Sequence, residues 1–276
     1  MKIIYENDEL DDLSMLRKNY KSYGIVILKN FFEGDEIYEN YNKDLKTIIR
    51  LAYKNKKIKR TEVNKLLNLR INNDEVLGKI LDLGSKNNKI LSGIKLKCSD
   101  KILNIVKCLL NSKLIGTMSV SDRLIMASNL KKEEKWFQGV HMDYNYVLQT
   151  KKSLTAHIGL GTYKNNGGVS FYLKSHKIKN LPLYIDDNGF HKIKMDYFKN
   201  FINKNFTRIE VPHDPKCLIL FDSQLLHETI RNTSKNVRIT QIFRYSDLAS
   251  KEAINKSWVA VEPRKIGDNY FDPIKF

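Results

Sequence analysis

The feature that most constrains the fold is a series of short β-branched and alternating segments in the second half of the chain. Asn, Asp, Gly and Ser separate these segments, and no helical pattern comes between them. Such a series predicts a mainly β fold, a jelly roll or barrel, over residues 113–250. The segments are KLIGTMSV, DRLIMASNL, SLTAHIGLG, GGVSFYLKS, TRIEVPH, KCLILFDS and VRITQIFRY.

The first 112 residues carry a different pattern, in which apolar side chains recur at helical spacing. The expected helices are Asp8–Tyr20, Gly34–Lys54, Ser99–Asn111 and one that opens near Thr61. A short strand is expected in GIVILKNFF (24–32), and Ser99 is the expected N-cap of its helix. We expect these helices to pack against one face of the β core.

No linker or internal repeat divides the chain, which contains only five Pro and 13 Gly. We therefore expect a single domain over residues 1–276, with a mainly helical part (1–112), a jelly-roll core (113–250) and a C-terminal tail (251–276). Residues 174–205 are weakly patterned and lie between two expected strands, which is typical of a lid or binding loop.

The chain is basic, with 48 Lys and Arg against 31 Asp and Glu and a formal net charge of +17. The excess is spread along the chain and is mostly Lys, a solvated point charge that is poorly suited to reading base edges. We therefore do not expect nucleic acid as the partner. A basic surface instead favours anionic small substrates.

Nothing in the sequence indicates a membrane or secreted protein. No apolar run is long enough to span a bilayer, and the N-terminus turns acidic after four residues. Cys98, Cys108 and Cys217 show no paired spacing, which indicates ordinary thiols in a reducing compartment. We expect a cytoplasmic location.

Two of the six histidines lie where a metal ion could be bound. His141 and Asp143 form an H-x-D pair, and in an extended segment residues i and i+2 project to the same face. His227 lies 86 residues further along, soon after the apolar run Leu218–Phe221. Two imidazoles and one carboxylate make the facial triad that leaves open positions on Fe(II) for O₂ chemistry. The pattern predicts a non-haem iron site made of His141, Asp143 and His227.

Arg238 adds a second element, eleven residues after His227 and at the start of VRITQIFRY. A dicarboxylate that chelates iron through its 2-oxoacid end needs its far carboxylate fixed, and a guanidinium does so with a bidentate pair. The hydroxyl of Thr229, two residues after His227, can donate to the same region. Together these residues favour an Fe(II)/2-oxoglutarate-dependent oxygenase.

The chain resembles the phytanoyl-CoA dioxygenase family of 2-oxoglutarate-dependent oxygenases. The resemblance lies in four segments, GIVILKNFF, WFQGVHMDYNY, NNGGVSFYLKSHK and HETIRNTSKNVR, which together cover about residues 20–250. The last is the most specific, because it closely matches the family's H-x-S/T-x-x-N-x-S-x-x-x-R run. Two departures stand out: Leu173-Lys174 replaces the family's Pro-Gly before Ser-His, and Met142 stands where some members carry a Gln.

The resemblance implies a double-stranded β-helix, a cupin-like jelly roll, that holds Fe(II) through His141, Asp143 and His227. Such an enzyme would use O₂ and 2-oxoglutarate to hydroxylate an unactivated C–H bond of a small, anionic or carrier-linked substrate, releasing succinate and CO₂. Halogenases of this class replace the carboxylate ligand with a small residue, so the presence of Asp143 favours hydroxylation or a related oxidation.

The resemblance also implies which residues bind 2-oxoglutarate, namely Arg238 and Thr229. His157 falls where the family often has a Trp, so it is expected to line the co-substrate pocket; a buried core histidine is the alternative. Ser175-His176 falls on the family's Ser-His-Lys, where we expect a structural role at a strand end and not metal binding.

Two other functions stay open at this point. One is the same chemistry directed at nucleic acid, as a demethylase or hydroxylase, although no duplex-reading insertion of Arg and aromatic residues is visible. The other is a non-catalytic jelly-roll binding protein, against which the intact ligand set and Arg238 speak.

Overall fold

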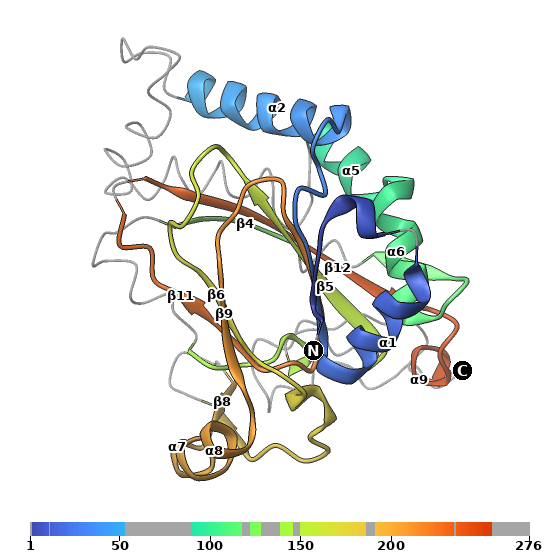
Figure 1. Ribbon diagram of the computed structural model, residues 1–276, viewed down its shortest axis with the longest axis vertical. Helices are drawn as coiled ribbons and strands as arrows, with labels where there is room; N and C mark the ends of the chain where they lie inside the picture. The colour runs from blue at the N-terminus through green and yellow to red at the C-terminus, as the bar shows by residue number, and fades with distance from the viewer. Residues whose placement is uncertain are drawn as a thin grey trace.

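A computed structural model describes residues 2–10, 12–52, 90–117, 122–127, 139–145, 150–185, 191–234 and 236–255. Its elements form three layers, with helices on one side of a large central sheet and a small sheet on the other (Figure 1). The helix expected near Thr61 and most of the expected C-terminal tail lie outside the described residues. The mainly β fold with flanking helices is confirmed.

Within the described residues, the large sheet has seven strands. In spatial order they are β1 (Ile4–Tyr5), β2 (Ile25–Leu28), β10 (Leu218–Asp222), β5 (Ser153–Leu160), β12 (Arg238–Asp247) and β3 (Ile115–Thr117), with β4 (Arg123–Ala127) also paired to β12. All pairs are antiparallel except β1 with β2. The small sheet has the order β11 (His227–Ile230), β6 (Gly168–Tyr172) and β9 (Arg208–Pro212). Each of the seven predicted segments therefore contains a strand, whereas β1 and β11 were not predicted.

Helices from the first half of the chain cover the outer face of the large sheet (Figure 1). They are α1 (Leu13–Tyr23), α2 (Glu36–Ala52), α5 (Leu91–Lys97) and α6 (Asp100–Leu110). The predicted start of the first helix at Asp8 is wrong, because the Asp12 carboxylate accepts the N–H groups of Ser14 and Met15 and so caps α1 there. Ser99 occupies the N-cap position of α6, as predicted, although its side chain makes no capping hydrogen bond.

The three central strands alternate between two apolar cores. Their outward side chains pack on the helices, and these include Leu154, Ala156, Ile158, Leu218, Leu220, Phe243 and Tyr245. Their inward side chains face the small sheet, where Ile219 and Phe221 meet Val169 and Phe171. Because side chains on a strand alternate with a period of two, Thr155 and His157 of β5 and Arg238, Thr240 and Arg244 of β12 also face inward. Polar residues are thus brought between the two sheets.

The stretch expected to be a lid or binding loop contains more structure than predicted. It holds the hairpin β7 (Leu183–Ile185) and β8 (His191–Ile193), followed by α7 (Met195–Tyr197), a π-helical turn η7 (Phe198–Ile202) and α8 (Asn203–Asn205). These short helices interrupt a series that was predicted to be helix-free. Lys174, at the position of the family's Gly, takes the left-handed φ of 70°. Lys174 therefore takes a backbone conformation that glycine adopts at no steric cost.

None of the helices in the described part of the chain is long and apolar enough to cross a bilayer.

Tyr41 ties α2 to the large sheet through a fully buried hydrogen bond. Its hydroxyl donates to Oε1 of Gln241 at 2.5 Å, and Nε2 of Gln241 donates to the carbonyl of Arg123 at 3.1 Å. Tyr41→Phe leaves Oε1 of Gln241 without this donor, so we expect a loss of about 1–3 kcal/mol in the free energy of unfolding, measured with urea. The control, Tyr163→Phe, alters an exposed residue and should change stability by less than about 0.5 kcal/mol. Equal effects at the two positions would contradict this account.

Candidate metal centre

Backbone hydrogen bonds hold the two predicted histidine ligands opposite each other. His141 and His227 form an isolated antiparallel bridge, in which the N–H of each donates to the carbonyl of the other at 2.9 Å. Side chains directly opposite in such a bridge lie on the same face, and the two ring centroids are 4.3 Å apart. Two segments far apart in the sequence are therefore fixed in register at this point.

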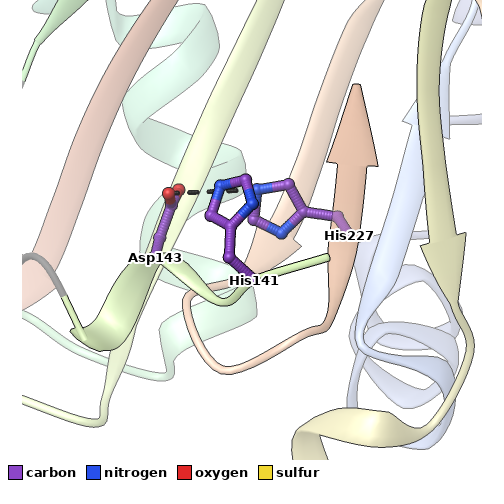
Figure 2. Close-up of side chains that lie close together, drawn as sticks. All are labelled: His141, Asp143 and His227. Atoms are coloured by element: carbon purple, nitrogen blue, oxygen red, sulfur yellow. Dashed lines mark ion pairs between the residues drawn. The ribbon is translucent and has the colours of Figure 1, made fainter. Parts of the chain in front are cut away.

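Asp143 completes the metal group, which consists of His141, Asp143 and His227, but its backbone is not extended as predicted. The expected extended segment ends before it, because Asp143 opens a short 3-10 turn, η5 (Asp143–Asn145). The N–H of Tyr144 donates to the Ser223 carbonyl at 2.7 Å and ties this turn to the end of β10. One ligand atom of each of the three residues still lies within 4.8 Å of the others, and Oδ1 of Asp143 is 3.9 Å from Nε2 of His227 (Figure 2).

Both histidines direct Nε2 to the shared site. Nδ1 of His141 lies 2.8 Å from the Gly139 carbonyl, and Nδ1 of His227 lies 2.9 Å from the Leu225 carbonyl. A carbonyl can only accept, so each Nδ1 carries the proton and each Nε2 keeps its lone pair. Desolvation lowers the pKa of His141 to about 3 and lowers the pKa of His227 as well. Both rings are thus neutral at ordinary pH, as metal binding requires.

The carboxylate of Asp143 is ionised and firmly held. Burial by itself would raise its pKa, but the positive charge and hydrogen bond of Arg244, with the neighbouring histidines, hold the pKa well below its usual range. Thr155 donates to Oδ2 at 2.5 Å, and Arg244 donates to Oδ1 at 2.9 Å. Two neutral imidazoles and one ionised carboxylate are the donor set that non-haem iron takes, so the residues fit the metal.

Arg238 lies buried at the far end of the inward face, 3% exposed. Its Nη1 donates to the carbonyls of Gly168 and Ile230, at 2.9 and 3.1 Å. This packing requires glycine: a Cβ on Gly167, whose φ is +84°, would lie 2.7 Å from the Ile230 carbonyl oxygen and 2.9 Å from Nη1 of Arg238. The Gly-Gly turn before β6 therefore sets the position of the guanidinium.

His157 and Thr229, the other predicted co-substrate residues, have different environments. Burial lowers the pKa of His157 well below its usual value, and the charges of Arg238, His213 and His227 lower it further. His157 thus lies within electrostatic reach of both the metal group and Arg238. Thr229 lies on β11 two residues after His227, on the same face, and is exposed.

Ser175 and His176 lie outside the metal group, in the 3-10 turn η6 (Ser175–Lys177). The Ser175 hydroxyl accepts the N–H of Leu226 at 2.9 Å, which fixes the residue before His227. Nε2 of His176 lies 3.2 Å from the Lys21 carbonyl. Both residues contact backbone groups of neighbouring segments, as expected for a structural role.

Sequence reasoning missed Thr155 and Arg244, although a signal was present. Thr155 lies two residues before His157 and Arg244 lies six residues after Arg238, so the alternation of each strand places both on the inward face. His213, which follows β9, is also buried, and no strand alternation in the sequence indicated this. Its Nε2 lies 3.2 Å from the Leu160 carbonyl.

Comparison with known proteins supports the same picture. A family model described as phytanoyl-CoA dioxygenase matches residues 20–240. No curated protein matches the chain by sequence.

Several solved structures share the fold at low sequence identity. The epimerase SnoN, in complex with Fe3+, alpha ketoglutarate and nogalamycin RO, is 14% identical with a TM-score of 0.59, over 95% of this chain and 93% of its own. EctD from S. alaskensis with bound Fe is 12% identical with a TM-score of 0.59, over 96% and 85%. The carbocyclase SnoK from nogalamycin biosynthesis is 14% identical with a TM-score of 0.54, over 89% and 90%. At these identities the likeness shows a common fold.

The buried His213 predicts a loss of stability in acid. Burial, and then the charge of Arg238, lower its pKa to about 4, so below pH 6.5 the unfolded chain binds a proton that the folded chain does not. The stability that depends on neutral His213 is present above pH 6.5 and is lost as the pH falls toward 4, by about 2 kcal/mol between pH 7.5 and pH 5. The change in unfolding free energy over this interval should be smaller by that amount in His213→Gln. If the free energy of unfolding falls equally with pH in the unaltered protein and in His213→Gln, then His213 is not the cause of the loss.

Proposed function

The chain belongs to the phytanoyl-CoA dioxygenase family of 2-oxoglutarate-dependent non-haem iron dioxygenases, and on this basis we propose that it hydroxylates an unactivated C–H bond of a small substrate. The observation that carries the proposal is the convergence of His141, Asp143 and His227, with both Nε2 atoms directed to the carboxylate side. We propose that these three side chains bind Fe(II). SnoN solved with Fe3+ and alpha ketoglutarate, and EctD solved with 2-oxoglutarate and 5-hydroxyectoine, support these cofactors.

Bound iron, with 2-oxoglutarate and O₂, would supply oxygen activation: one oxygen atom enters the product hydroxyl, the other enters succinate, and CO₂ leaves. The protein's part is to bind and orient. Arg238 anchors the distal carboxylate of the co-substrate with a charge-assisted pair, from a position that the Gly167-Gly168 turn fixes. His157 lines the path between the metal group and Arg238, and Thr229 donates from the open side of β11.

We propose that the described residues of the stretch 174–205 (174–185 and 191–205) form the wall or lid beside the substrate. Side chains of this stretch pack with Val140 and Met142, which flank His141, and with Leu226, which precedes His227. The lid is thereby joined to both histidine segments, so it can exclude water where the substrate meets the metal. The substrate itself is expected to be anionic or carrier-linked, because the chain carries a net charge of +17.

We also propose that the chain works as one domain. The helices before residue 111 and the large sheet share a single apolar core, to which Tyr41, Ile105 and Phe243 belong. A shared core of this kind joins the helical part to the jelly roll.

Removal of a metal ligand tests the function directly. We expect His141→Ala and Asp143→Ala to lose iron-dependent conversion of 2-oxoglutarate to succinate, with an unchanged far-UV circular dichroism spectrum. His176→Ala removes a histidine outside the group and should keep its iron content and its turnover. Candidate substrates sorted by charge are screened in the same assay, and product analysis separates hydroxylation from other oxidations. Full activity in both ligand variants would contradict the assignment of His141 and Asp143 as metal ligands.

Replacement of Arg238 should mainly raise the KM for 2-oxoglutarate. Loss of a charge-assisted hydrogen-bonded pair corresponds to about 1.5–3 kcal/mol, so the KM for 2-oxoglutarate should rise about 10–100-fold in Arg238→Ala and less in Arg238→Lys. Arg208→Ala is the matched control, because Arg208 pairs with Glu210 and with Glu228, whose side chain lies on the opposite face of β11 from His227. An unchanged KM in Arg238→Ala would mean that the anchor lies elsewhere.

A further inference from the structure

The inner face of the large sheet holds both oxygens of Asp143. Thr155 Oγ1 donates to Oδ2 at 2.5 Å, and Arg244 Nη2 donates to Oδ1 at 2.9 Å. Thr155 and Arg244 are direct partners in the pairing of β5 with β12. Asp143 is 4% exposed, and the Arg244 side chain is 11% exposed. The orientation of the carboxylate is therefore set by two central strands and not only by its own short turn.

The two oxygens differ in what they can still bind. Oδ1, the acceptor from Arg244, is also the oxygen that lies 3.9 Å from Nε2 of His227, so it faces the metal side. A carboxylate oxygen has two lone pairs, so Oδ1 can bind a metal and still accept from Arg244. Oδ2 is engaged by the Thr155 hydroxyl on the other side. This arrangement favours coordination through one oxygen, which leaves more positions open on the metal.

We propose that Thr155 and Arg244 are positioning residues that set Asp143 for one-oxygen binding of the metal. The proposal rests on the proposed function, because it takes His141, Asp143 and His227 as the ligands. Partners that orient a ligand typically change metal affinity about 10–100-fold when removed.

Arg244 allows a test with two opposite outcomes. Its guanidinium is permanently charged and close to the site, so by charge alone it repels a dication. If repulsion dominates, removing Arg244 tightens metal binding. If positioning dominates, as we propose, removal weakens metal binding even though a repelling charge is gone. The sign of the change therefore separates the two roles, and a merely structural role would lower the melting temperature without changing the affinity.

The experiment measures the affinity of the apoprotein for Mn(II), from the electron paramagnetic resonance signal of the free ion. R244Q and T155V should bind Mn(II) about 10–100-fold more weakly than the unaltered protein. R244K keeps the charge and a donor, and T155S keeps the hydroxyl, so both should recover most of the affinity. R208Q is the control, because Arg208 pairs with Glu210 and Glu228, and it should bind like the unaltered protein.

Tighter binding in R244Q would overturn the role of Arg244, and unchanged binding in both R244Q and T155V would overturn the whole proposal. If R244Q does not fold, comparison of T155V with T155S still tests the proposal, because these two variants differ in the hydroxyl that donates to Asp143. The outcome is separate from that of the proposed function. A protein that binds Mn(II) but never converts 2-oxoglutarate fails only the proposed function, whereas full turnover with unchanged affinities in the variants fails only this inference.

Discussion

The structure depends most on the two reciprocal hydrogen bonds between His141 and His227. They join the start of β11, in the small sheet, to the segment that carries Asp143 (Figure 2). Asp143 is in turn held by Thr155 and Arg244 of the large sheet. The metal group therefore lies between the two sheets, and contacts with both of them fix its geometry.

The alternation of side chains on β5 and β12 explains how one sheet serves a core and a site at once. Outward residues such as Ile158 and Phe243 pack under the helices, while His157 and Arg238 face inward. Burying a guanidinium is costly unless its donors are satisfied, and the carbonyls of Gly168 and Ile230 accept from Arg238. The turn at Gly167 is thus part of the site, although it bears no functional side chain.

Much of this arrangement could be predicted from the sequence, because it rests on local patterns. The series of β segments predicted the sheets, and the pattern of His141, Asp143 and His227 predicted which residues come together. The rest depends on contacts between distant segments. The 3-10 turn at Asp143 is held by contacts with Ser223, Thr155 and Arg244, and side chains between 178 and 206 pack on the segments that carry the two histidines. Neither set of contacts produces a periodic pattern of residues from which it could be predicted.

The most direct test of the account is an anaerobic crystal structure of the protein with Fe(II) and 2-oxoglutarate, with data collected at the iron absorption edge. We expect one anomalous peak bound by Nε2 of His141, Nε2 of His227 and a single oxygen of Asp143. We also expect the distal carboxylate of 2-oxoglutarate to lie on Arg238. A peak at other side chains, or a co-substrate that makes no contact with Arg238, would contradict it.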